Sequence, residues 1–442
     1  MWLLPLFPLV ARAAAFVYYR IRYDGPRVPA TGPVLLVANH PNSLFDPVLV
    51  VAAARRPVRF LAKAPLFADA KVGRLVRAAG AIPVYRRADD PSLMERNVDA
   101  FRAVTEALGA GAAVGIFPEG LSHDAPSLAP LKTGAARIAL AAGPLAGHAF
   151  PIIPIGLVFR RKDVFRSEAV VLTGAAVPWD DLRPRGAEDA DTVHTLTRRI
   201  TKAIRAVTLN LEQWADRPLV ELAVRIWEVE RHVLPESGER VARLARTTSV
   251  LAAVRREADT EGLALADDIA AHGRRLRRLG LRPADLVADV GLARGLRWSA
   301  SRAPLIMPVA AAGAVTSWAL FIVPYQLTGR IVGAMRPEPD QAASHKLLVG
   351  IPVYGAWIMA LALGSWAMWG RTTAVVVALG APLLGMIGLV IRERWRGAWK
   401  DARRFLLLRS RRSLVAQLAA RQHELAGRLG RLVERYSVAG YL

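Results

Sequence analysis

His40 and Asp46 are six residues apart and could together activate an alcohol. Both lie in the segment NHPNSLFD at residues 39–46, directly after the apolar run of residues 33–38. That run is typical of a buried strand, so we expect His40 at the C-terminal end of a strand, where reactive side chains of α/β sheets meet ligands. A carboxylate on one imidazole nitrogen fixes the tautomer and leaves the other nitrogen free to accept a proton from a hydroxyl. The spacing predicts such a dyad, and an ordinary turn histidine is the alternative.

A second candidate site stretch is FPEG at residues 117–120, which also ends an apolar run. Proline followed closely by glycine requires a tight turn, and such a turn can aim Glu119 into the same crevice. A capping or surface role is the alternative for Glu119. His123 and Asp124 follow, but no further histidine or carboxylate stands at ligand spacing, so we expect no metal site.

Three cations stand in stretches that could bind phosphate. Of the 60 basic residues only seven are lysines, and two of these, Lys63 and Lys132, fall inside the motif-like stretches. Lys132 precedes a predicted helix, whose N-terminal amide groups favour anions. Arg87 follows an apolar strand beside a second arginine, and a guanidinium can grip a phosphate with paired hydrogen bonds. A solvated loop is the alternative for the arginine pair.

These stretches together resemble the glycerolipid acyltransferase superfamily, which includes the lysophosphatidate and glycerol-3-phosphate acyltransferases. NHPNSLFD followed by FPEG about eighty residues later carries the resemblance. The stretches GIFPEGLSHD at 115–124, LAPLKTGAAR at 128–137 and FRS at 165–167 resemble the branch that acts on glycerol 3-phosphate or dihydroxyacetone phosphate. Leu121 departs from that branch, which usually has a second glycine there, and this leaves the acceptor open.

The resemblance implies transfer of a fatty acyl group from acyl-CoA or acyl carrier protein to a hydroxyl of a phosphorylated glycerol, in phospholipid biosynthesis. The implied catalytic residues are His40 and Asp46. The implied substrate-binding residues are Asn39, Lys63, Arg87, Glu119, Gly120 and Lys132. We expect no cofactor besides the thioester, and direct attack without an acyl-enzyme, because no serine or cysteine lies in a recognisable nucleophile elbow. A lysophospholipid acyltransferase and a non-catalytic membrane lipid-binding protein are the alternatives.

The elements that must position these residues alternate between short apolar strands and amphipathic helices from about residue 30 to 210. This pattern predicts an α/β domain with a largely parallel sheet flanked by helices. The expected strands are 34–37, 59–62, 81–84, 113–117, 152–155 and 169–172, and the expected helices include 47–54, 70–78, 92–108 and 134–141.

The rest of the chain divides by composition into four further parts. Residues 1–29 are an interfacial or anchoring segment, and 211–303 read as a helical accessory region. Residues 304–391 form a membrane region, in which 347–369 and 372–391 are long enough to span as a hairpin around Gly370. The segment 304–329 contains three prolines, so we expect it not to cross fully. Residues 392–442 form a basic amphipathic tail that suits either an anionic lipid surface or helix pairing.

The charge of the chain implies an anionic partner. The net charge is +23, and cysteine is absent, which excludes disulfides and thiol catalysis. Nucleic acid is not expected as that partner, because no zinc pattern, RNA motif or clear helix-turn-helix is present. The expected partner is anionic membrane lipid. Residues 392–437 carry 13 basic against four acidic residues, which favours a cytoplasmic tail and, with an even number of spans, a cytoplasmic catalytic domain at the cell membrane.

Overall fold

The computed structural model describes residues 5–69, 72–85, 92, 95, 97–147, 149–233, 237–287 and 306–438. The chain divides into two compact units. The first unit comprises Met1–Trp214, Pro235–Ala245 and Pro339–Ser344. The second unit comprises Ala215–Leu234, Arg246–Glu338 and His345–Leu442.

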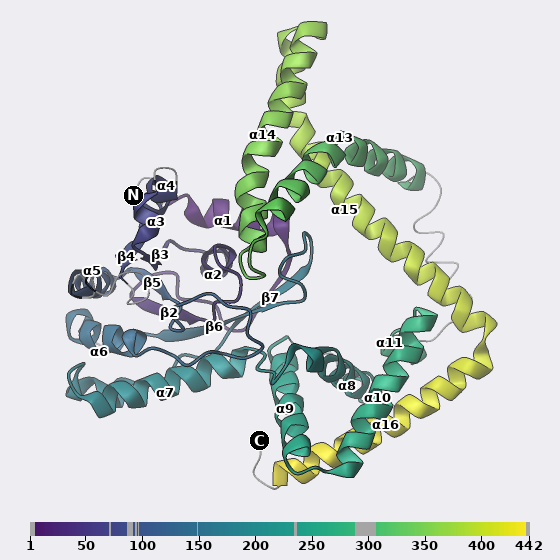
Figure 1. Ribbon diagram of the computed structural model, residues 1–442, viewed down its shortest axis with the longest axis horizontal. Coiled ribbons are helices and arrows are strands. Elements are labelled where there is room, and N and C mark those ends of the chain that lie inside the picture. The colour runs from purple at the N-terminus through teal and green to yellow at the C-terminus, as the bar shows by residue number, and fades with distance from the viewer. Residues whose placement is uncertain are drawn as a thin grey trace. The chain divides into compact units, whose positions relative to one another are not determined.

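The first unit is built on a seven-stranded sheet with the strand order β1-β7-β6-β2-β5-β3-β4 (Figure 1). The strands are β1 (Arg20–Asp24), β2 (Val34–Ala38), β3 (Val58–Lys63), β4 (Ile82–Val84), β5 (Ala113–Ile116), β6 (Ile152–Phe159) and β7 (Glu168–Thr173). The five strands from β6 to β4 run parallel, and β7 reverses direction beside β6. The predicted α/β fold with a largely parallel sheet is therefore confirmed.

Strand β2 is the centre of this sheet. All five of its residues are apolar and fully buried, as expected for a strand with neighbours on both edges and helices on both faces. Val37 pairs with Ile116 of β5 on one side and Pro154 of β6 on the other. The C-terminal ends of these three strands consequently lie side by side.

The edge strand β1 was not predicted. Arg20–Asp24 fell within the expected anchoring segment 1–29, but it pairs in parallel with β7. Three of its five residues are charged and none is fully buried, so it lacks the apolar signal that reveals an interior strand. Residues 20–24 therefore belong to the sheet and not to an anchor.

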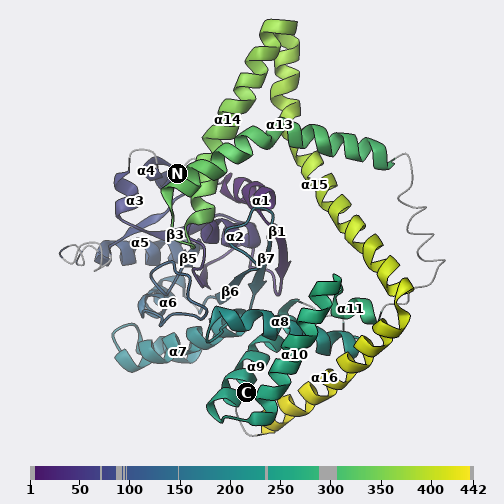
Figure 2. The same cartoon turned by 45° about the vertical axis from the view of Figure 1, so that its right-hand side comes forward.

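Helices cover both faces of the sheet. On one face, α5 (Asn97–Gly109), α6 (Gly134–Ala146) and α7 (Ala190–Val207) bury an apolar cluster that includes Leu35, Val114 and Leu196. On the other, α1 (Phe7–Tyr18) packs against α2 (Phe45–Ala54), as Figure 2 shows. The short helices α3 (Pro65–Ala68) and α4 (Val72–Ala78) join β3 to β4. Helix α5 begins five residues later than predicted, where the side chain of Asn97 bonds both main-chain groups of Tyr85.

The second unit contains a helical cluster. Its helices are α8 (Arg217–Glu230), the later half of α9 (Ser237–Arg256), α10 (Thr260–Leu279), α11 (Pro283–Leu286) and α16 (Arg412–Val438). The apolar stripe of the tail, which includes Leu425 and Leu432, is buried among these helices together with Ile226 and Ile269. Of the two uses considered for the tail, the structure shows helix pairing.

Three long helices also belong mainly to the second unit: α13 (Ile306–Met335), α14 (Ala342–Trp369) and α15 (Arg371–Ser410). Within the described residues, Ala342–Trp369 and Arg371–Glu393 are long and apolar enough to cross a membrane. Only Gly370, with φ of +88°, separates them, so they form the tight hairpin that the sequence predicted. Helix α13 continues through Pro324 and packs along α15, with Ser317 Oγ 3.3 Å from the carbonyl oxygen of Gly385. That α13 does not cross fully stays a prediction.

Candidate active site

Loops after three adjacent strands meet at one edge of the sheet. His40 follows β2, Glu119 follows β5, and Lys162 follows β6. Because these strands are parallel neighbours, their C-terminal ends lie at the same edge. Residues that are about 80 and 120 positions apart in the chain are thereby brought into one site.

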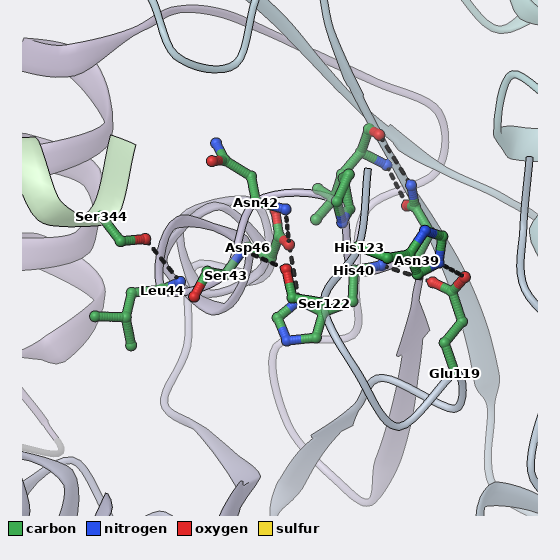
Figure 3. Close-up of polar contacts among 12 residues, drawn as sticks. Asn39, His40, Asn42, Ser43, Leu44, Asp46, Glu119, Ser122, His123 and Ser344 are labelled. Carbon is green, nitrogen blue, oxygen red and sulfur yellow. Dashed lines mark hydrogen bonds and ion pairs between the residues drawn. The ribbon is translucent and has the colours of Figure 1, made fainter. Parts of the chain in front are cut away.

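The imidazole of His40 and the carboxylate of Asp46 form the expected contact (Figure 3). His40 Nδ1 lies 2.8 Å from Asp46 Oδ2, and the side chain of His40 is 19% exposed while that of Asp46 is fully buried. Asp46 reaches back from the first turn of α2. The carboxylate holds the proton on Nδ1, and within the described residues Nε2 has no hydrogen-bond partner. The free nitrogen can therefore accept a proton from a ligand.

The buried environment acts on Asp46 in two opposite directions. Burial raises the pKa of this carboxyl group, whereas its hydrogen bond to His40 and the main-chain N–H of Asn42, at 2.6 Å, lower the pKa. The positive charge of Lys162 also lowers it. Oδ1 is buried and has no hydrogen-bond partner among the described residues. The ionised form is thus held by two hydrogen bonds, both at Oδ2, and by the charge of Lys162, against the effect of burial.

The main chain of His40 is held on both sides by the turn that follows β5. Its N–H donates to Glu119 Oε1 at 2.8 Å, and its carbonyl oxygen accepts from the N–H of His123 at 3.2 Å. These bonds fix the main chain at the point where β2 ends and the loop that carries His40 begins.

An aromatic stack supports the ring of His40. Phe117 lies parallel to the imidazole, with ring centroids 4.1 Å apart, and Phe60 lies 5.5 Å behind Phe117. Gly115 makes room for this arrangement, because a Cβ there would come within 2.3 Å of the Phe60 ring. The stack leaves the imidazole little freedom to tilt.

Glu119 has a different position from the one predicted. Its side chain is 1% exposed, and its oxygens accept from the N–H of His40, from Ala129 N at 2.8 Å and from His123 Nε2 at 2.5 Å. Ala125 N donates to Nδ1 of His123, so the proton of that ring is on Nε2. The carboxylate is not aimed into an open crevice. It acts on the site through His40.

Asn39 has a framework role, and its predicted substrate contact stays a prediction. Its amide nitrogen donates to the carbonyl oxygen of Leu157 at 3.1 Å, and its amide oxygen accepts from Leu157 N at 2.8 Å. Both polar atoms of the side chain thus continue the pairing of β2 with β6 one step past the end of the strand. The main chain turns away from the sheet at the next residue, His40.

Gly120 and Lys132 lie against each other. Gly120 has φ of +74°, and a Cβ there would come within 2.6 Å of Lys132 Nζ, so the lysine side chain lies across the turn. Lys132 is exposed and forms no side-chain hydrogen bond or ion pair within the described residues. Lys63 is exposed at the C-terminal end of β3. Arg87 lies outside the described residues.

Lys162 is a site residue that the sequence analysis missed. Its ammonium group donates to the carbonyl oxygen of Pro41 at 2.8 Å and pairs with Asp124 Oδ1 at 2.6 Å. Its rarity, as one of seven lysines, was the available signal. Asp124 is thus an ion-pair partner, and no cluster of three or more metal-ligating side chains occurs in the described parts of the chain.

The chain is similar in sequence to known acyltransferases. Residues 20–158 match the family model named Acyltransferase. Glycerol-3-phosphate O-acyltransferase 2 of Saccharomyces cerevisiae is 35% identical over 144 residues, which cover 31% of this chain and 19% of the relative. The chloroplastic 1-acyl-sn-glycerol-3-phosphate acyltransferase BAT2 of Brassica napus is 28% identical over 152 residues, covering 34% and 40%.

Among solved structures, the 1-acyl-sn-glycerophosphate acyltransferase PlsC of Thermotoga maritima is similar over 45% of this chain and 76% of its own, with 18% identity and a TM-score of 0.33. This chain spans well under two thirds of the length of the two curated relatives above. The family match includes the dyad and the Glu119 turn. The resemblance to glycerolipid acyltransferases is confirmed, and it lies in residues 20–158, which match the acyltransferase family model.

Proposed function

We propose that the protein transfers an acyl group from an acyl thioester to a hydroxyl of glycerol 3-phosphate, as a step in phospholipid biosynthesis. The observation that carries this proposal is the His40–Asp46 pair, with Nε2 of His40 free at the edge of the sheet. Its location within an acyltransferase-family domain, and relatives named as glycerol-3-phosphate acyltransferases, support the reaction class and the acceptor.

In the proposed reaction, His40 Nε2 accepts the proton of the acceptor hydroxyl while that oxygen attacks the thioester carbonyl carbon. Asp46 stabilises the imidazolium that forms. The carbon–sulfur bond then breaks, and the proton passes from Nε2 to the departing sulfur. The products are an ester and a thiol, and the thioester is acyl-CoA or acyl carrier protein. The scheme uses no other cofactor.

Lys132 is the proposed ligand of the acceptor phosphate. It is exposed, lies across the Gly120 turn next to Glu119, and has no competing partner in the described part of the chain. Lys63, from the end of β3, and Arg87 are the further candidates. An ammonium group without a counterion favours a doubly charged phosphate.

A membrane location is part of the proposal. Only 6% of the most apolar stretch of Ala342–Trp369 and 11% of that of Arg371–Glu393 is buried, unlike the core helices of a soluble protein. Helix α1 also exposes apolar side chains, among them Leu9 and Phe16. Two spans after the catalytic domain keep that domain and the basic tail on the same, cytoplasmic side.

A lysophospholipid is the second candidate acceptor, and one observation favours it. Leu121 stands where the glycerol-3-phosphate branch usually has glycine, and its apolar side chain is 46% exposed beside the site. Such a surface suits an acceptor that already carries one acyl chain.

The test uses the full chain in vesicles with labelled acyl-CoA and either glycerol 3-phosphate or 1-acyl-glycerol 3-phosphate. We expect labelled product with glycerol 3-phosphate, and none with His40→Ala. Product only from the acylated acceptor would establish the second candidate. Equal turnover by the two proteins would exclude His40 as the base, and a lack of turnover with both acceptors would favour a lipid-binding role.

A further inference from the structure

Tyr19 is a fully buried tyrosine directly after α1, and its side chain reaches the loop that carries His40. Its hydroxyl donates to the carbonyl oxygen of Lys162 and accepts from Asn42 Nδ2 at 2.8 Å. The rings of Phe45 and Phe159 pack against it, each with its centroid 5.2 Å away. The hydroxyl therefore links three segments: the end of α1, the loop after β2 and the loop after β6.

Asn42 connects this hydroxyl to the dyad. Its side chain, also fully buried, bonds Tyr19, while its main-chain N–H donates to Asp46 Oδ2 at 2.6 Å. The direction of the bonds is determined by Tyr19. Because its only proton goes to Lys162, the hydroxyl oxygen is left to accept from the amide of Asn42. Asp46 Oδ2 is then held by two donors, Asn42 N–H and His40 Nδ1–H.

We infer that Tyr19 and Asn42 are positioning residues, which extend the dyad into a hydrogen-bonded chain Tyr19–Asn42–Asp46–His40. The inference rests on the proposed function, since it assigns these residues to the reaction of His40. Neither residue reaches the substrate, because both are completely buried. Their role is to set the place of the Asp46 carboxylate and, through it, the tautomer and direction of the imidazole.

The titratable groups around the chain determine how pH should affect it. Asp46 faces His40 and Lys162, and Tyr19 faces Tyr18 and Asp163 as well as Asp46. Burial raises the pKa of Tyr19 well above its ordinary value, so its hydroxyl keeps its proton at working pH. The Asn42 N–H lowers the pKa of Asp46. When this bond is loosened, Asp46 takes up a proton at a higher pH, and activity is lost earlier on acidification.

The first test is Tyr19→Phe, which keeps the ring and removes the hydroxyl. With acyl-CoA and glycerol 3-phosphate, kcat should fall roughly tenfold, the effect of one lost buried hydrogen bond on the base, while both KM values stay the same. The acid limb of the pH profile should move to higher pH. Tyr23→Phe, at an exposed tyrosine of β1, is the control and should behave like wild type. Wild-type kcat and pH profile in Tyr19→Phe would overturn the inference.

A double-mutant cycle tests whether the two residues form one chain. Asn42→Ala breaks the same link from its other end but keeps the main-chain N–H. If Tyr19 and Asn42 act as a unit, the double variant loses about as much activity as the worse single variant. Multiplication of the two losses would show independent effects and refute the chain.

A readout without turnover separates this inference from the proposed function. Nuclear magnetic resonance of isotope-labelled histidine in the full chain reports which nitrogen of His40 carries the proton, with His40→Gln to assign the signal. Tyr19→Phe should reduce the share of Nδ1–H, and Tyr23→Phe should not. If the wild-type protein transfers no acyl group but Tyr19→Phe still changes the tautomer, the proposed function fails and the hydrogen-bonded chain Tyr19–Asn42–Asp46–His40 is supported. An unchanged tautomer in Tyr19→Phe contradicts the chain whether or not the protein is active.

Discussion

Replacing Glu119 with glutamine should lower kcat and leave the KM for the acceptor unchanged. The carboxylate accepts from three donors: the N–H of His40 at one oxygen, and Ala129 N and His123 Nε2 at the other. Glutamine has the same shape but only one oxygen, and its amide nitrogen cannot accept. One side of this arrangement must therefore lose its bonds.

The number of N–H donors left without an acceptor decides which way the glutamine amide points. With the amide nitrogen toward His123, two buried donors lack an acceptor, and with it toward His40, only one does. Each orphaned donor costs about 1–3 kcal/mol, so the second orientation is favoured by that amount. The damage then falls on the main chain of His40. The melting temperature should drop by about 2–4 °C for each kcal/mol lost. A displacement of the base by about 1 Å costs up to roughly 100-fold in kcat.

The assay combines steady-state kinetics with thermal unfolding followed by tryptophan fluorescence, which Trp179 reports from inside the first unit. Glu106→Gln, on the exposed face of α5, is the matched control and should change neither measurement. An acceptor KM that rises tenfold with kcat unchanged would refute the reasoning. In that case Glu119 would touch the acceptor, as the sequence alone suggested.

Three other variants test separate parts of the site. Asp46→Asn should lose most of its kcat. Burial raises the pKa of Asp46 in the folded state above its unfolded value, so the ionised carboxylate costs stability at neutral pH. At that pH the variant should therefore melt at or above the wild-type temperature. A lower melting temperature would contradict this sign. Lys132→Met should raise the acceptor KM at least about tenfold and leave the thioester KM alone, whereas equal changes would exclude a phosphate contact. Gly115→Ala should destabilise the domain by about 1–3 kcal/mol in thermal or denaturant unfolding, because its Cβ meets the Phe60 ring, and wild-type stability would show that the ring can move.

The sequence predicted the fold and the contact between His40 and Asp46 well, because both depend on patterns of short range. The strand β2 is a continuous apolar run, and Asp46 lies within one loop of His40, so their contact needs little information from the rest of the chain. The apolar hairpin could be predicted for the same reason. Two long apolar stretches separated by Gly370 leave few other arrangements.

What could not be predicted depends on contacts between distant segments. The roles of Glu119 and Asn39 follow from main-chain groups, the N–H of His40 and the amide of Leu157, that every sequence possesses and no residue type announces. Tyr19 fell within the expected anchoring segment 1–29, and its role could not be predicted because its hydrogen-bond partners are 23 and 143 residues away. Strand β1 pairs with a strand that comes almost 150 residues later.

The main chain of residue 40 is held in place by bonds that do not involve its side chain, so the conformation of the loop does not depend on the reactive imidazole. Residue 40 donates its main-chain N–H to Glu119 and accepts from His123 at its carbonyl oxygen, and any non-proline amino acid supplies both groups. Exchanging the imidazole for an inert group should therefore leave the loop in place and, on the proposed function, abolish turnover while the substrates still bind. A descendant that kept this turn and lost only the ring could serve as a lipid carrier or a sensor without having to evolve a new scaffold.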